Sequence, residues 1–100
     1  MKIIATPPLR QFSIEYPDGH SAINLWESKV KAAKWQTPAD IKAEFSSASF
    51  VAKNRVIFNI GGNKYRLIVA IAYRIGVVYI KFIGTHAQYD AVDATTVEME

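Results

Sequence analysis

The sequence predicts an α+β fold in which N-terminal helices pack on one face of an antiparallel sheet. Up to about Phe45 the apolar residues recur at helical spacing, whereas from Arg55 onward they alternate with a period of two. The pair Gly61 and Gly62 separates two alternating runs, as the turn of a β-hairpin does. A chain of 100 residues, 50% of them hydrophobic, is the size of one domain, which we assign to residues 1–100.

Helical patterns fill the first half of the chain after a short strand, MKIIA. Pro7 and Pro8 end this strand and suit the first turn of a helix better than its interior. Further on, Thr37 and Asp40 are placed as an N-cap and an N3 acid around Pro38, a pattern typical of a helix start. The apolar spacing therefore predicts three helices, at about residues 9–16, 21–34 and 38–45.

Three strands are predicted next, at residues 55–60, 64–73 and 77–83. If residues 62–63 form a two-residue turn, Asn59 pairs with Arg66 in the hairpin. A second turn at residues 75–76 is predicted to place Arg66 opposite Thr85 and Ala70 opposite Lys81. The core face, which meets the helices, is expected to carry Leu67, Val69, Val78, Ile80 and Phe82.

The opposite face of this sheet is predicted to be open and basic. Small side chains at Ala70 and Ala72 leave room above the sheet, and His86 follows the last strand close to Arg66. The face is expected to carry Arg55, Asn59, Lys64, Arg66, Tyr79 and Lys81. An aromatic ring among basic side chains is a common arrangement in the binding of single-stranded RNA. The other interpretation is that an uncovered sheet face is simply polar.

Charge along the chain also indicates an anionic partner. The net charge is +3, and residues 45–89 contain no acidic residue but do contain Lys53, Arg55, Lys64, Arg66, Arg74 and Lys81. Such a stretch favours a phosphate backbone as a partner, although a solvated lysine-rich surface has the same composition.

Several function classes are disfavoured. With no cysteine, the chain has no disulfide, no thiolate nucleophile and no cysteine-ligated zinc. Two distant histidines and scattered acids show no metal-ligand spacing, so we expect neither a metal nor another cofactor. In the opening MKIIATPPLR, the apolar run before the two prolines is too short for the core of a signal peptide. No later apolar stretch is long enough to span a membrane. We therefore expect a soluble cytoplasmic protein with no membrane contact.

The run RVIFNIGGNKYRLIVAIAY, followed by VVYIKFIGTHAQYD, resembles the HigB type of toxin in the RelE superfamily. The upstream TPADIKAEF is similar to the family's segment before the sheet, so the resemblance covers about residues 35–97. It implies a RelE-like fold with a short C-terminal helical turn. It further implies the toxin of a type II toxin–antitoxin system, an endoribonuclease (mRNA interferase) that cuts messenger RNA in the ribosomal A site. The expected partners are messenger RNA, the ribosome and a HigA-like helix-turn-helix antitoxin, with DNA reached only through the antitoxin.

Metal-free RNA cleavage needs activation of a 2′-hydroxyl, stabilisation of the charge that develops, and a proton for the leaving oxygen. We expect His86 to act as acid or base, Arg66 and Lys64 to hold phosphate oxygens, and Tyr89 to orient a base or assist proton transfer. The predicted RNA contacts are Lys53, Arg55, Asn59, Tyr79 and Lys81.

Each of these roles has an alternative. A histidine at a strand end is often a cap, and Tyr89 could equally fix the C-terminal turn. For the whole chain, the alternatives are a non-catalytic RNA- or ribosome-binding module and a protein-interaction domain. Growth arrest on induction, compared with that of His86→Ala, distinguishes an enzyme from a binding module.

Overall fold

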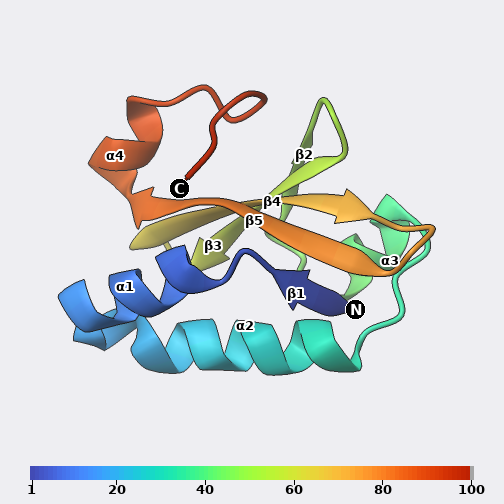
Figure 1. Cartoon of the computed structure of the whole chain (residues 1–100), viewed down its shortest axis with the longest axis horizontal. Helices are drawn as coiled ribbons and strands as arrows, with labels where there is room; N and C mark the ends of the chain where they lie inside the picture. Colours follow the sequence, from blue (N-terminus) through green and yellow to red (C-terminus); the bar gives the residue numbers. More distant parts are fainter. Residues whose placement is uncertain (100) are drawn as a thin grey trace.

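Five strands form one sheet in the order β1-β5-β4-β3-β2, and α1 and α2 cover one of its faces (Figure 1). The computed structural model describes residues 1–99. Its elements are β1 (Lys2–Ile4), α1 (Pro7–Glu15), a 3₁₀ turn (Pro17–Gly19), α2 (His20–Ala32), α3 (Pro38–Glu44), β2 (Ser49–Val51), β3 (Arg55–Ile60), β4 (Tyr65–Ala72), β5 (Val77–Thr85) and α4 (His86–Asp90). The predicted α+β fold, with its C-terminal helical turn, is therefore confirmed.

The three predicted N-terminal helices form close to their expected limits. Pro7 and Pro8 occupy the first turn of α1, where a missing backbone N–H costs nothing. At α3, the Thr37 hydroxyl accepts a hydrogen bond from the Asp40 amide (3.4 Å) and the Asp40 carboxylate accepts one from the Thr37 amide (3.1 Å). This reciprocal cap confirms the predicted start of α3. Together the helices bury one apolar stripe, made of Leu9, Phe12, Ile23, Trp26, Val30 and Ile41.

The β3–β4 hairpin has the predicted register, with Asn59 opposite Arg66. Gly61 and Gly62 have φ values of 64° and 70°, which other residues adopt only at a cost, so the glycines are what permit this tight connection. Leu67 and Val69 are fully buried in the core beneath the helices, as predicted. The sheet also has two edge strands outside the meander: β1 runs parallel to β5, and β2, which the sequence did not reveal, pairs with β3.

The predicted register between β4 and β5 is wrong for two reasons: the connection spans residues 73–76 instead of a two-residue turn, and β5 contains a β-bulge. Arg66 pairs with Gly84 rather than Thr85, and Ala70 pairs with Tyr79 rather than Lys81. The shift lies between Ile68 and Val69 of β4, and it leaves Lys81 as the extra residue of β5. A residue inserted into a strand exchanges the two faces for everything that follows it.

Phe82 consequently lies on the second face of the sheet instead of in the main core, and Ile83 takes its place beneath the helices. The second face is therefore not open, as we had predicted, but carries a small apolar cluster of its own. Ile57, Ile68 and Phe82 form its buried centre. The C-terminal part of the chain packs over them through Tyr89, Val92, Ala94 and Val97 (Figure 1).

Candidate active site

Helix α4 places His86 and Tyr89 at the end of β5. Thr85 caps this helix: its hydroxyl accepts a hydrogen bond from the Gln88 amide (3.3 Å), and the Gln88 side chain accepts one from the Thr85 amide (2.9 Å). His86 is the first residue of the helix and is exposed. Tyr89 follows one turn later and is partly buried, so both side chains rise from one well-capped turn.

Gly84 allows α4 to fold closely onto the sheet. A β-carbon at this position would lie 2.6 Å from Cζ of Phe82 and 2.7 Å from Oε1 of Gln88, which are both too close for any side chain. Gly84 also pairs with Arg66, so the backbone opposite this arginine carries no side chain. Gly84, Thr85 and Gln88 are not among the site residues expected from the sequence, although the spacing T-x-x-Q of Thr85 and Gln88 is a capping-box pattern.

Arg66 projects from β4 toward α4. Its guanidinium carbon lies 5.8 Å from the centre of the Tyr89 ring, within the range of a cation–π contact. Its hydrogen bonds are two long ones, each of 3.4 Å, to the backbone carbonyls of Asn63 and Tyr65. Within residues 1–99 it has no carboxylate partner at 4.0 Å or less. The planar donor therefore keeps most of its capacity for an anion.

The sequence suggests that Lys64 and Arg66 share one surface, but in the structure they do not. Its ammonium group lies 2.8 Å from the carboxylate of Asp18, in the connection between α1 and α2. Tyr65 donates a hydrogen bond of 2.6 Å to the same carboxylate. The hydrogen bond from Lys64 and, as the next largest cause, the one from Tyr65 hold the pKa of Asp18 below its ordinary value. In turn, the hydrogen bond to Asp18 raises the pKa of Tyr65 to about 12. Lys64 is thus turned toward the helical layer, although its side chain is 66% exposed.

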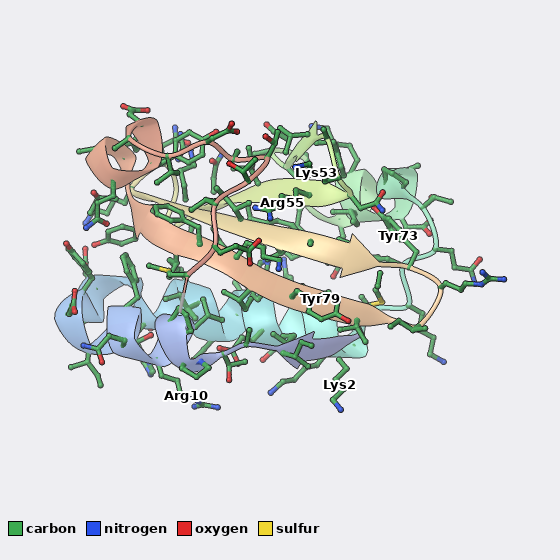
Figure 2. All side chains as sticks on the ribbon, turned by 45° about the horizontal axis from the view of Figure 1, so that its top comes forward. Lys2, Arg10, Lys53, Arg55, Tyr73 and Tyr79 are labelled. Carbon is green, nitrogen blue, oxygen red and sulfur yellow. The ribbon has the colours of Figure 1, made fainter. Side chains whose placement is uncertain are left out.

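Arg55 is buried, with only 7% of its side chain exposed, whereas we had predicted it on an open surface. Its guanidinium donates to the carbonyls of Ala94 (3.2 Å) and Val97 (2.7 Å) and to the carboxylate of Glu98 (2.6 Å). In Figure 2 it points from β3 toward the C-terminal segment. In this conformation Arg55 fastens that segment to the sheet and does not face RNA, so we do not propose it as an RNA contact.

Glu98 joins a second basic residue to the same segment. Its other oxygen lies 2.9 Å from the ammonium group of Lys81, the bulged residue. The hydrogen bonds from Lys81 and from Arg55 lower the pKa of Glu98, against an opposing effect of burial. The ammonium of Lys81 also lies 5.7 Å from the ring centre of Tyr79, which is partly exposed. Lys81 and Tyr79 therefore form a pair beside the C-terminal segment.

The remaining predicted contacts, Asn59 and Lys53, lie at opposite ends of β3. Asn59 is partly buried and stands opposite Arg66 in the sheet. Lys53 is exposed in the β2–β3 turn, where its φ of 65° is in the left-handed region. The structure thus brings Asn59, Arg66, Tyr89 and His86 to one end of the sheet and leaves Lys53 near the other.

Among residues 1–99, no group of three or more histidine, aspartate or glutamate side chains is placed to hold a metal ion. None of the helices in this part of the chain is long and apolar enough to cross a membrane.

The contacts of Arg55 lead to a prediction about stability. Arg55→Met keeps an apolar stem in the sheet but removes three hydrogen bonds made by a buried charge, and it should lower the free energy of unfolding by about 2–3 kcal/mol. Lys53→Ala, two residues away and exposed, should change it by less than about 0.5 kcal/mol. Chemical denaturation followed by circular dichroism measures both. Equal stability of the two variants would contradict the fastening role of Arg55.

Comparison with known proteins agrees with this architecture. A family model described as HigB_toxin, the RelE-like toxic component of a toxin–antitoxin system, matches residues 20–92. The chain is similar to the mRNA interferase HigB of Escherichia coli O6:H1, with 27% identity over 92 residues that cover 90% of this chain and 89% of that protein. It is similar as well to the mRNA interferase toxin HigB of Escherichia coli K12, with 26% identity over 93 residues that cover 90% and 88%.

Proposed function

Because this chain belongs to the HigB family, the RelE-like toxic components of toxin–antitoxin systems, we propose that it is an endoribonuclease that cleaves messenger RNA. The relatives that match 90% of its length are named mRNA interferases. We further propose that cleavage takes place on messages held in the ribosomal A site, and that the group of Arg66, His86 and Tyr89 performs the chemistry.

The observation that carries this proposal is the position of Arg66. In the part of the chain that the structure describes, Arg66 has no carboxylate partner. Its guanidinium lies 5.8 Å from the centre of the Tyr89 ring, which belongs to α4, and the first residue of α4 is the exposed His86. A planar guanidinium binds two phosphate oxygens at once, whereas Arg55 and Lys81 on the same face already have a carboxylate partner.

The proposed reaction is an internal transfer of the phosphoryl group. The 2′-oxygen attacks the adjacent phosphorus, the bond from phosphorus to the 5′-oxygen breaks, and the products are a 2′,3′-cyclic phosphate and a 5′-hydroxyl. One proton leaves the 2′-hydroxyl and one must reach the 5′-oxygen, and we assign one of these transfers to His86. Arg66 stabilises the extra negative charge on the non-bridging oxygens, and the Tyr89 ring holds the guanidinium in position.

Lys64 is proposed as an auxiliary group. Its ion pair with Asp18 is exposed, and such pairs contribute about 0–1 kcal/mol. A phosphate can therefore take Lys64 from Asp18 at little cost. Lys53, Asn59, Tyr79 and Lys81 are proposed as contacts to the RNA outside the reacting phosphate, in backbone binding or base stacking.

The partner of a toxin in such a system is an antitoxin. We propose a helix-turn-helix protein of the HigA kind, encoded next to this gene, that covers the Arg66 end of the sheet with an acidic or helical segment. It would give the complex its contact with DNA. Failure of any neighbouring gene product to co-purify with the chain or to relieve its toxicity would count against this proposal.

The test of the enzymatic function is cleavage of a ribosome-bound message and of the same free RNA, mapped by primer extension. Cleavage of the bound message by the wild type, together with growth arrest on induction, is the expected result. His86→Ala should bind ribosomes equally well but leave the message intact and the cells growing. If the wild type binds ribosomes and arrests growth without cutting RNA, the chain is a binding module instead.

A further inference from the structure

A second basic surface lies at the other end of the sheet from Arg66 and His86. It is a cleft of about 590 Å³ between the start of β1, the segment that follows α2, and the β4–β5 turn. Four cationic side chains line it and no acidic one does: Lys2, Lys31, Lys34 and Arg74. Partly exposed Tyr73, the polar Gln36 and a set of apolar residues complete the lining, and the apolar ones are Met1, Ala33, Trp35, Ile75 and Gly76. We call it the basic cleft.

The positive charge of this cleft is mostly uncompensated. Within residues 1–99, Lys2, Lys34 and Arg74 have no carboxylate within 4.0 Å. Lys31 has one, Glu27, at 3.9 Å, but the lysine is 66% exposed and such a pair holds little energy. On the second face of the sheet, by contrast, Glu98 bridges two cations. The cleft therefore carries mostly unpaired positive charge, whereas the cations beside the C-terminal segment are paired.

The fold, and not one flexible segment, brings these cations together. Lys2 lies on β1, Lys34 follows α2, and Arg74 lies in the β4–β5 turn. The amide of Lys2 donates to the carbonyl of Gly76 (2.8 Å), which ties β1 to this turn. Figure 2 shows Lys2 and Tyr73 toward the end of the sheet that is away from α4. β4 has 8 residues, so its two ends lie roughly 23 Å apart at about 3.3 Å per residue.

We propose that the basic cleft binds the phosphate backbone of RNA outside the cleavage site. Exposed cations spread over an open cleft suit a polyanion, since each can neutralise one phosphate, and the partly exposed ring of Tyr73 offers a face on which a base can stack. Because roughly 23 Å separates the cleft from Arg66, one phosphate cannot contact both. The cleft therefore holds a distant part of the message or a phosphate of ribosomal RNA. The proposal rests on the proposed function in taking RNA as the ligand.

The test compares two double variants that remove the same charge. Lys34→Ala/Arg74→Ala takes two cations from the cleft, and Arg10→Ala/Lys29→Ala takes two exposed cations from α1 and α2. All four side chains are exposed, so both variants should fold, which thermal melting checks. The probe is a 2′-O-methyl RNA, which lacks the attacking hydroxyl, and its dissociation constant is measured against salt concentration by fluorescence anisotropy.

The cleft variant is expected to bind more weakly and to flatten the slope of log K against log salt by about 1.4, since each single-strand phosphate contributes about 0.7. The control variant should keep the wild-type slope. Equal slopes for the two variants, together with equal binding of the two variants to ribosomes, would overturn the proposal. A loss of antitoxin affinity by the cleft variant, with the binding of RNA and of ribosomes unchanged, would also overturn it and assign the cleft to an acidic protein.

Co-sedimentation with ribosomes identifies the source of the phosphate. A defect with ribosomes but not with isolated RNA assigns the cleft to ribosomal RNA, and a defect with both assigns it to the message. The rate of cleavage at saturating toxin should stay within about twofold of the wild type, because the cleft is far from Arg66. Failure of the wild type to cleave RNA would contradict the proposed enzyme, whereas the salt slopes would still decide the binding role of the cleft.

Discussion

Arg66→Ala is expected to slow the cleavage step by about a hundredfold or more, with ribosome binding nearly unchanged. Mutations that remove one preorganised donor from a developing anion in other enzymes have effects of this size. Arg66 fits this role because its guanidinium has no carboxylate partner within residues 1–99 and is oriented by the ring of Tyr89 at 5.8 Å. Single-turnover cleavage of a ribosome-bound message at saturating toxin measures the step directly.

Two controls separate charge from packing. Arg66→Lys keeps one charge but loses the planar fork, so its rate should fall between those of Arg66→Ala and the wild type. Lys53→Ala removes an exposed cation near the other end of β3 and should weaken association while the rate at saturation stays near wild type. A wild-type rate for Arg66→Ala at saturation would remove Arg66 from the chemistry and transfer the role of charge stabilisation to the lysines.

His86→Gln is expected to lose cleavage to a similar degree. Glutamine can still form hydrogen bonds, but it cannot take up and release a proton near neutral pH. Because His86 is the exposed first residue of α4, and Thr85 rather than His86 supplies the cap, the substitution should leave the helix intact. The melting temperature of His86→Gln should therefore match that of the wild type.

Chemical rescue distinguishes a proton carrier from a structural group. His86→Ala should regain part of its cleavage rate when imidazole is added, since an exposed position leaves room for the free base. His20→Ala provides the matched control, because His20 is exposed on α2. Within the described residues, its side chain forms one hydrogen bond, to the side chain of Asn24 (3.0 Å). This variant should cleave at the wild-type rate with or without imidazole. Full activity of His86→Gln would refute the assignment.

The sequence by itself determined the elements whose signals are local. The capping box of Thr37 and Asp40 and the proline pair at the start of α1 each depend on residues within one turn of each other. The hairpin register followed from the glycine turn and the period-two pattern, because any slip would have buried Arg66 beneath the helices. The α+β class and the position of Arg66 beside the C-terminal turn followed from these elements.

Tertiary structure alone decided which cations remain free. The bulge at Lys81 has no marker in a strand that reads as regular, yet it sends Phe82 to the second face and so creates the apolar cluster on which the C-terminal segment packs. That packing brings Glu98 to Arg55, 43 residues away, and the connection between α1 and α2 brings Asp18 to Lys64, 46 residues away. Pairings between residues so distant in sequence depend on how separate elements pack, and no periodicity within one element encodes them. The same packing gathers Lys2, Lys34 and Arg74, from three separate segments, into one cleft.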